Sequence, residues 1–251
     1  LPWLPDPALW SRVAAEYDNC LGMRCPFRES CFVLRLKREA AAARILVVNH
    51  HLLFADLSAR ARGVGYEQAA VLPAWDRLII DEAHNIEDSA TMFFSQSFGK
   101  LAVYRSISRL FRKRSGRALG LLPDLIALTT FTHLEDEFEA LFQRLRDGLE
   151  ELDSKALLHF NMESSIRLGS RRSTELFEDI APALQELNRS VKHISSLAKS
   201  LFDHLEENEI EDIGQWEAMA MLRRIENLAA VCQTFLEYDE RPDRICWLER
   251  R

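Results

Sequence analysis

A short apolar run that ends in an acidic pair is the feature that most restricts the fold. Leu78-Ile79-Ile80 is followed directly by Asp81-Glu82-Ala83-His84. An apolar run between polar residues is typical of a parallel strand that is buried on both faces. Ligands bind at the carboxyl ends of such strands, and nucleotide hydrolysis needs two carboxylates there, one for Mg²⁺ and one for the attacking water. The alternative is that Asp81 only caps the helix that follows.

The partner motif of such a site is a phosphate-binding loop of the form G-x-x-x-x-G-K-[ST], and residues 1 to 251 do not contain it. The pair Gly99-Lys100 lacks the earlier glycine, the Ser/Thr and a preceding strand, which predicts a loop and not a phosphate cradle. Two carboxylates cannot hydrolyse ATP without groups that hold the phosphates. We therefore expect the chain to be a segment of a longer protein and to be inactive by itself.

Three cysteines near the start of the chain suggest a metal-binding loop. They are spaced Cys20-x4-Cys25-x5-Cys31, whereas zinc sites favour about two to four residues between paired ligands and often recruit histidine. Iron–sulfur clusters take thiolates, usually a set of four. A cluster loop, a set of reduced cysteines without metal, and a zinc site that adds one histidine all stay open. Cys232 and Cys246 lie among apolar residues and are predicted to be small buried side chains.

Basic residues gather in two stretches although the net charge of the chain is −7. Residues 24–44 hold six basic residues against two acidic ones, and residues 105–117 hold six with no acidic residue. A strip of positive charge is typical of a channel that follows a phosphate backbone. For the second stretch, an ordinary exposed basic helix explains the pattern equally well. The candidate DNA-contacting residues are Arg24, Arg28, Arg35, Lys37 and Arg38 in the first stretch and Arg105, Arg109, Arg112, Lys113 and Arg114 in the second.

Beyond residue 90 the chain is predicted to be helical. Apolar residues recur every three or four positions in residues 134–152, 184–201 and 216–236, which predicts helices packed around a common core. Residues 245–248 are predicted to form a strand, with residues 165–168 as its partner, and nearer the start of the chain residues 45–48 are predicted to form a further strand. No apolar stretch approaches the roughly 20 residues that span a bilayer, and an odd total of five cysteines argues against a secreted disulfide scaffold. We therefore expect a cytoplasmic protein without a membrane segment.

Several motifs in the first third of the chain occur together in a known family. They are Leu9-Trp10-Ser11-Arg12-Val13, Cys20-Leu21-Gly22-Met23-Arg24-Cys25-Pro26, Cys31, Val47-Val48-Asn49-His50-His51-Leu52-Leu53-Phe54-Ala55-Asp56-Leu57 and Ile79-Ile80-Asp81-Glu82-Ala83-His84-Asn85. In this combination they resemble the iron–sulfur DNA helicases of the DinG/XPD family, and within it the bacterial DinG branch. The resemblance covers roughly residues 9 to 90.

The resemblance implies an α/β fold with a large all-α insertion. On that basis residues 1–40 form a small helical and loop segment that carries the iron–sulfur cluster, and residues 41–92 form part of the first RecA-like motor domain. Residues 93–240 form the helical Arch domain. Residues 241–251 form the strand that returns to the motor domain.

The resemblance also implies the chemistry of the parent protein, an ATP-dependent DNA helicase that translocates 5′ to 3′ on single-stranded DNA. Asp81 would hold Mg²⁺ with ATP, Glu82 would polarise the attacking water, and His84 would couple the nucleotide site to DNA. The expected partners are ATP and single-stranded or forked DNA, and the protein is expected to be monomeric.

The cofactor that the resemblance implies is a 4Fe-4S cluster. Cys20, Cys25 and Cys31 match three of its ligands, and the fourth cysteine would lie upstream. Two other classes of protein stay open as alternatives. One is a DNA-binding or adaptor relative without a motor, and the other is a zinc-binding module.

Overall fold

The structure of the protein, a computed structural model, divides into two compact units, Leu1–Gln96 and Ser97–Arg251. The residues that it describes are 25–60, 71–160, 164–169, 173–210, 212–240 and 244–250. Two of the candidate site residues, Cys20 and Arg24, lie outside them. The division of the chain into four functional parts stays a prediction, and each compact unit is described by itself.

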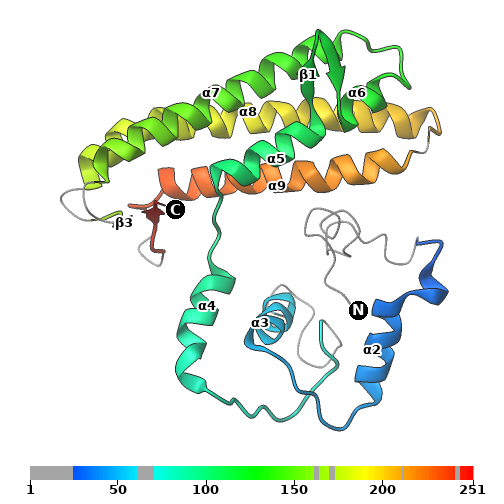
Figure 1. Ribbon diagram of the computed structural model, residues 1–251, viewed down its shortest axis with the longest axis vertical. Helices are drawn as coiled ribbons and strands as arrows, with labels where there is room; N and C mark the ends of the chain where they lie inside the picture. The colour runs from blue at the N-terminus through cyan, green and yellow to red at the C-terminus, as the bar shows by residue number, and fades with distance from the viewer. Residues whose placement is uncertain are drawn as a thin grey trace. The chain divides into compact units, whose positions relative to one another are not determined.

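The first unit consists of short helices joined by extended segments (Figure 1). Its elements are the single turn η3 (Arg28–Ser30), the helices α2 (Phe32–Ala42) and α3 (His50–Ala59), the single turn η5 (Ala83–Asn85) and the helix α4 (Ile86–Phe94). Asn49 caps α3 by accepting a hydrogen bond from the backbone N–H of Leu52 at 2.9 Å. Helices α3 and α4 pack through Phe54, whose ring centroid lies 6.3 Å from that of Phe93 and 5.6 Å from that of Phe94.

The two strands expected in the first unit are not formed. Residues 45–48 and 78–80 are extended, but neither segment is hydrogen-bonded to a neighbouring strand within the described part of the chain. Their apolar side chains are correspondingly exposed, by 83% at Ile45, 96% at Val47 and 95% at Ile79. The prediction of a buried parallel strand that ends at Asp81 is therefore wrong for this structure. A strand needs a partner to satisfy its backbone groups, and no described segment supplies one.

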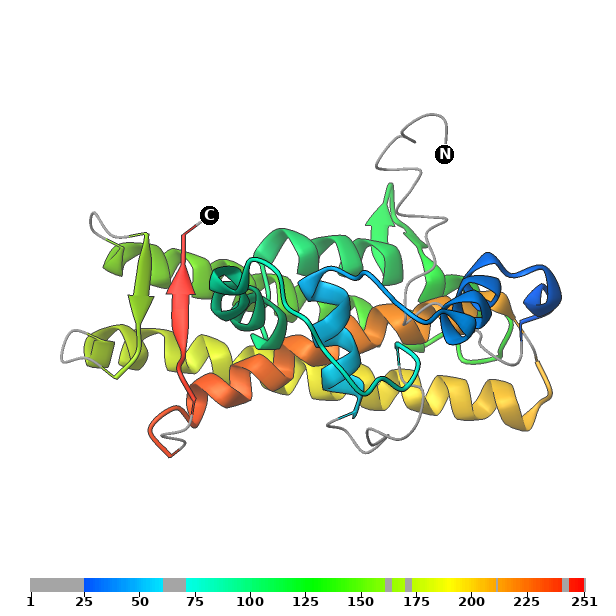
Figure 2. The ribbon, with the colours of Figure 1, turned by 90° about the horizontal axis from the view of Figure 1, so that it is seen from below.

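Long helices make up most of the second unit. They are α5 (Lys100–Leu110), α6 (Leu121–Ile126), α7 (Leu134–His159), α8 (Ser173–Glu207) and α9 (Ile213–Leu236). Helix α8 packs along both α7 and α9, and α5 lies against α9 (Figures 1 and 2). Two small antiparallel sheets complete the unit, β1 (Arg112–Arg114) with β2 (Arg117–Leu119) and β3 (Ser165–Arg167) with β4 (Trp247–Glu249). None of the helices in the described ranges is long and apolar enough to cross a lipid bilayer.

The apolar stripes predicted from the sequence are confirmed as core faces of the second unit, except that Trp216, at the start of the third stripe, is exposed. Phe138 and Leu145 on α7, Leu187 on α8, and Ile225 and Cys232 on α9 are all at most 1% exposed. Each helix carries its apolar residues on one face, so the three helices bury these faces against one another. The prediction that Cys232 is a small buried side chain is confirmed as well.

The predicted pairing of residues 165–168 with residues 245–248 is also confirmed. Ile166 lies opposite Leu248, and the backbone N–H of Leu168 donates to the carbonyl oxygen of Cys246 at 2.8 Å. Cys246 is 6% exposed, as expected for a small buried side chain. Strand β4 thus pairs within the helical unit, and its return to a motor domain stays a prediction.

Candidate functional site

Asp81 and Glu82 lie in a sharp turn that joins an extended segment to α4. The Oδ1 atom of Asp81 accepts a hydrogen bond from the backbone N–H of Glu82 at 3.0 Å. Glu82 itself adopts the left-handed conformation, with a φ of 49°. The N-cap of α4 is Asn85, so the alternative that Asp81 only caps this helix is wrong. Backbone conformations as uncommon as that of Glu82 cluster at functional sites.

The side chains of the acidic tetrad are open to solvent. Oε2 of Glu82 lies 3.2 Å from Nδ1 of His84, and these side chains are 68% and 72% exposed. Asp81 is exposed as well. Accessible carboxylate oxygens are the protein ligands that a hydrated Mg²⁺ ion takes, usually one or two at a time. Glu82 and His84 therefore lie side by side, with Asp81 in the same turn and not at the edge of a sheet, and their assignment to a nucleotide site stays a prediction.

Cys25 and Cys31 flank the single turn η3. The carbonyl oxygen of Cys25 accepts from the N–H of Arg28 at 3.2 Å, and the carbonyl oxygen of Arg28 accepts from the N–H of Cys31 at 3.3 Å. Both cysteines are half-buried and carry free thiols. No group of three or more histidine, cysteine or acidic side chains suited to a metal ion occurs within the ranges that the structure describes. The two thiols fit the thiolate chemistry of an iron–sulfur cluster, and Cys20, the third cysteine expected there, lies outside the described residues.

The basic residues expected at α2 lie on the surface of that helix. Arg35, Lys37 and Arg38 are exposed, and Arg28 precedes them in η3. Arg35 lies 3.6 Å from the carboxylate of Glu39, one turn later, and both side chains are more than half exposed. An exposed pair of this kind contributes little to stability. The positive charge of α2 is therefore accessible to an anionic partner.

The alternative that residues 105–117 form an ordinary exposed basic helix is wrong. Helix α5 ends at Leu110 because the chain turns into the β1–β2 hairpin, and Arg112, Lys113 and Arg114 form strand β1. Arg109 pairs with Glu217 of α9. Lys113 pairs with Glu139 of α7 at 2.6 Å, so the fold neutralises two of the candidate charges internally.

Arg105 remains on α5 and is exposed. Its Nε atom donates to the carbonyl oxygen of Leu101, one turn earlier, at 3.3 Å. This bond neutralises no charge, because its acceptor is a carbonyl oxygen. Arg105 therefore stays a candidate contact for an anion.

The prediction that Gly99 and Lys100 lie in a loop is also wrong. Gly99 is the N-cap of α5 and Lys100 is the first residue of that helix, so the pair is not a loop. The ammonium group lies 2.7 Å from Asp153 and 2.6 Å from Glu150, both on α7. Hydrogen bonds to Asp153 and Glu150 hold the pKa of Lys100 well above its usual range. This lysine is committed to a contact between two helices and does not form part of a phosphate cradle.

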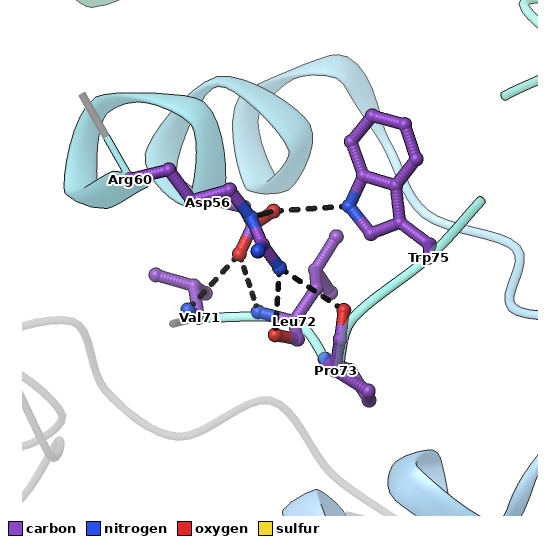
Figure 3. A network of polar contacts seen from close by, with 6 residues as sticks. All are labelled: Asp56, Arg60, Val71, Leu72, Pro73 and Trp75. Carbon is purple, nitrogen blue, oxygen red and sulfur yellow. Dashed lines mark hydrogen bonds and ion pairs between the residues drawn. The ribbon is translucent and has the colours of Figure 1, made fainter. Parts of the chain in front are cut away.

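A buried ion pair between Asp56 and Arg60 is the feature that the sequence analysis missed (Figure 3). Oδ2 of Asp56 accepts from Nε of Arg60 at 2.6 Å and from Nε1 of Trp75 at 3.1 Å. Its Oδ1 accepts from the N–H of Leu72 at 2.8 Å and of Val71 at 3.1 Å. The sequence did contain a signal for this ion pair, namely an acidic and a basic residue one turn apart in a largely apolar helix.

This network fixes α3 to the segment that runs on to the acidic tetrad. Asp56 is 0% exposed and Arg60 is 3% exposed. Nη2 of Arg60 also donates to the carbonyl oxygens of Leu72 at 3.2 Å and Pro73 at 3.1 Å. Burial by itself raises the pKa of Asp56, but the hydrogen bonds from Arg60, Leu72 and Trp75 outweigh it and lower the pKa below its ordinary value. The carboxylate is therefore charged and fully hydrogen-bonded in the folded protein.

Part of the chain is similar in sequence to known helicases. The chain is 40% identical over 92 residues to the ATP-dependent DNA helicase YoaA of Escherichia coli K12, which is 37% of this chain and 14% of YoaA. It is 40% identical over 83 residues to the ATP-dependent helicase DinG of Mycobacterium tuberculosis, which is 33% of this chain and 11% of that protein. Over this third of its length, the chain is similar to helicases of the DinG/XPD family. The DinG-like chain thus spans only a small part of the curated relatives that it matches.

Other comparisons neither extend nor contradict this similarity. The ATP-dependent DNA helicase DinG of Salmonella choleraesuis is 31% identical to the DinG-like chain over 87 residues, which is 34% of the chain and 11% of that helicase. No protein-family model matches the chain. No solved structure matches it either.

Proposed function

We propose that the chain is part of an ATP-dependent DNA helicase. The observation that carries this proposal is its 40% identity to YoaA and to DinG. The geometry of the acidic turn supports it, because Asp81 and Glu82 present two accessible carboxylates next to His84. In this proposal Asp81 binds the Mg²⁺ ion of ATP, Glu82 polarises the attacking water, and His84 couples the nucleotide site to DNA.

The proposed cofactor is a 4Fe-4S cluster held by Cys20, Cys25, Cys31 and a fourth cysteine from outside this chain. Two observations support this part of the proposal. Cys25 and Cys31 are free thiols on one short loop, and backbone hydrogen bonds fix the turn between them. Such a cluster would have a structural role next to the basic surface of α2.

The helical second unit is proposed to act as the Arch domain, which guides or separates the DNA strands. Its core of long helices supports this role, because a rigid body can hold an exposed charged surface in a fixed position. We propose that the parent protein is a monomeric cytoplasmic enzyme that moves 5′ to 3′ on single-stranded or forked DNA.

The test of the proposed function is ATP hydrolysis by the complete gene product, with and without single-stranded DNA. We expect Glu82→Gln to lower the turnover rate by about 10²–10⁴-fold, as for loss of a catalytic acid–base group, while ATP still binds. Glu87→Gln is the matched control, because Glu87 is an exposed glutamate in the first turn of α4. Unchanged hydrolysis in the Glu82→Gln protein would remove Glu82 from its proposed role.

Two further results separate the alternatives. DNA binding without any DNA-stimulated ATP hydrolysis would favour an adaptor without a motor. The metal content of the anaerobically purified gene product decides the cofactor. About four iron and four sulfide ions per chain support the cluster, whereas stoichiometric zinc without iron favours a zinc-binding module.

A further inference from the structure

The β1–β2 hairpin is a rigid projection whose backbone geometry is well defined. Arg114 lies opposite Arg117, and Arg112 lies opposite Leu119. The two residues between the strands, Ser115 and Gly116, have φ values of 51° and 78°. Two successive left-handed residues are typical of the tight turn that matches the twist of a two-stranded hairpin. Figure 1 shows this hairpin next to α6.

The two faces of the hairpin differ in their surroundings. Side chains alternate between faces along a strand, and residues that lie directly opposite each other share a face. Lys113 and Ala118 form one face, which is turned towards the helices, since Lys113 bonds to Glu139 and Ala118 packs against the core. The opposite face carries Arg112, Arg114 and Arg117, and all three are exposed. We call these three residues the outward arginine face.

The charge on the outward arginine face is not compensated by the protein. Arg114 and Arg117 are directly opposite each other, an arrangement of like charges that destabilises a strand pair. Within the described part of the chain neither guanidinium group makes a hydrogen bond or ion pair. Arg112 donates to the carbonyl oxygen of Ser108 at 3.0 Å, which leaves its charge unneutralised. An anionic partner would relieve this repulsion.

The acidic residues around Lys113 lie on the inner side of the hairpin. Lys113 is bonded to Glu139, and the neighbouring carboxylates of Glu135 and Asp136 act on Lys113 as well. These three acidic residues belong to the first turns of α7. An approaching polyanion is therefore repelled from the inner face and attracted to the outward arginine face.

We propose that the outward arginine face binds the phosphate backbone of single-stranded DNA. Guanidinium groups bind phosphate oxygens through two parallel hydrogen bonds, and the fixed geometry of a hairpin keeps the arginines in place. Arg112 and Arg114 are about 7 Å apart along the strand, so the face is a short row suited to consecutive phosphates of one strand. The inference rests on the proposed function for the choice of DNA, whereas the arrangement of charges does not depend on it.

The test compares two variants of the full 251-residue chain that lose the same charge. One is Arg112→Gln/Arg114→Gln/Arg117→Gln. The matched control is Lys192→Gln/Lys199→Gln/Arg223→Gln, which removes three exposed basic residues from α8 and α9. The probe is a fluorescent oligothymidylate of about 16 nucleotides, the upper end of the usual site sizes for single strands. Binding is measured by anisotropy over a range of salt concentrations, together with a duplex of the same length.

We expect the hairpin variant to lose affinity and salt dependence. Loss of three phosphate contacts makes the slope of log affinity against log salt about 2 less negative. A fourfold rise in salt then weakens the wild-type chain about sixteenfold more than the variant. The control variant is expected to keep the wild-type slope. Circular dichroism and thermal unfolding of both variants verify that the helical unit is folded.

Three results would overturn the inference: a hairpin variant with the wild-type slope, an equal loss in the control variant, or a loss confined to the duplex probe. Failure of the proposed function is recognised separately. ATP hydrolysis that depends on Glu82, combined with unchanged binding by the hairpin variant, would refute the role of the hairpin and leave the helicase assignment in place. If the hairpin variant loses binding and the gene product does not hydrolyse ATP, the role of the hairpin is supported and the helicase assignment is refuted.

Discussion

Replacing Asp56 by alanine tests the network that holds the first unit together. The Asp56 carboxylate is fully buried and accepts hydrogen bonds from the guanidinium group of Arg60 and the indole N–H of Trp75. It also accepts from the backbone N–H groups of Val71 and Leu72. The Asp56→Ala variant leaves a buried guanidinium without its counter-charge and these three N–H groups without their acceptor.

The expected magnitude follows from the burial of both charges. Removal of one partner of a buried ion pair costs about 3–5 kcal/mol, because the other charge is left uncompensated. A buried donor without an acceptor costs about 1–3 kcal/mol, although such costs are not additive within one network. The described core of this unit is small, so a loss of this size is expected to separate α3 from residues 71–75. Amide exchange at Val71 and Leu72 should then accelerate by about 10²–10⁴-fold.

Hydrogen exchange followed by mass spectrometry measures this effect locally. Peptides from α3 and from residues 71–75 should lose protection in the Asp56→Ala variant, whereas peptides from α7 should keep it. Asp76→Ala is the control, because Asp76 is an exposed aspartate next to Trp75. Unchanged protection at Val71 and Leu72 in the Asp56→Ala variant would refute the view that this network holds α3 to the segment before the tetrad.

The same network has a predicted pH dependence. Burial acts to raise the pKa of Asp56, but the hydrogen bonds from Arg60, Leu72 and Trp75 lower it below its ordinary value of 3.8. A carboxylate with a lowered pKa in the folded state stabilises the fold fully above its unfolded pKa, and this contribution is lost as the pH falls through the folded pKa. Protection of α3 should therefore be constant near neutral pH and decrease below about pH 3.8. The Asp56→Ala variant should lack this decrease.

Two glycines and the cysteines provide further predictions. A Cβ atom at Gly120 would lie 2.7 Å from a backbone oxygen of α5, at a φ of 125°, so Gly120→Ala should destabilise the helical unit by more than the roughly 1–3 kcal/mol of a strained backbone alone. Gly116→Ala, which meets no atom within 4 Å, should cost only about 1–2 kcal/mol, and equal melting temperatures for the two variants would contradict the steric argument. Cys25 and Cys31 should be alkylated in the native metal-free chain, as mass spectrometry would detect, because both thiols are partly exposed. Cys232 should react only after unfolding, since burial raises the pKa of its thiol to about 12, and native alkylation of Cys232 would show that this part of the core is open.

The apolar stripes show what periodicity can predict. The residues that repeat along 134–152, 184–201 and 216–236 became the core faces of α7, α8 and α9. This prediction succeeded because the angle between successive residues of a helix determines which side chains share a face, whatever the partner is. The strands expected at residues 45–48 and 78–80 failed because a strand also needs a hydrogen-bonded neighbour, which the apolar run does not supply.

The charged residues show where tertiary structure decides. Arg109, Lys113 and Arg114 look equivalent in the sequence, but the fold pairs the first two with carboxylates on α9 and α7 and leaves Arg114 exposed. Asp56 and Arg60 are likewise indistinguishable from an exposed helical pair until residues 71–75 cover them. The sequence by itself therefore determined the helical core and the relationship to helicases, since both depend on residue patterns along the chain. Only the tertiary structure decided which charges are neutralised or buried, because the residues that pair with them or cover them lie far away in the sequence.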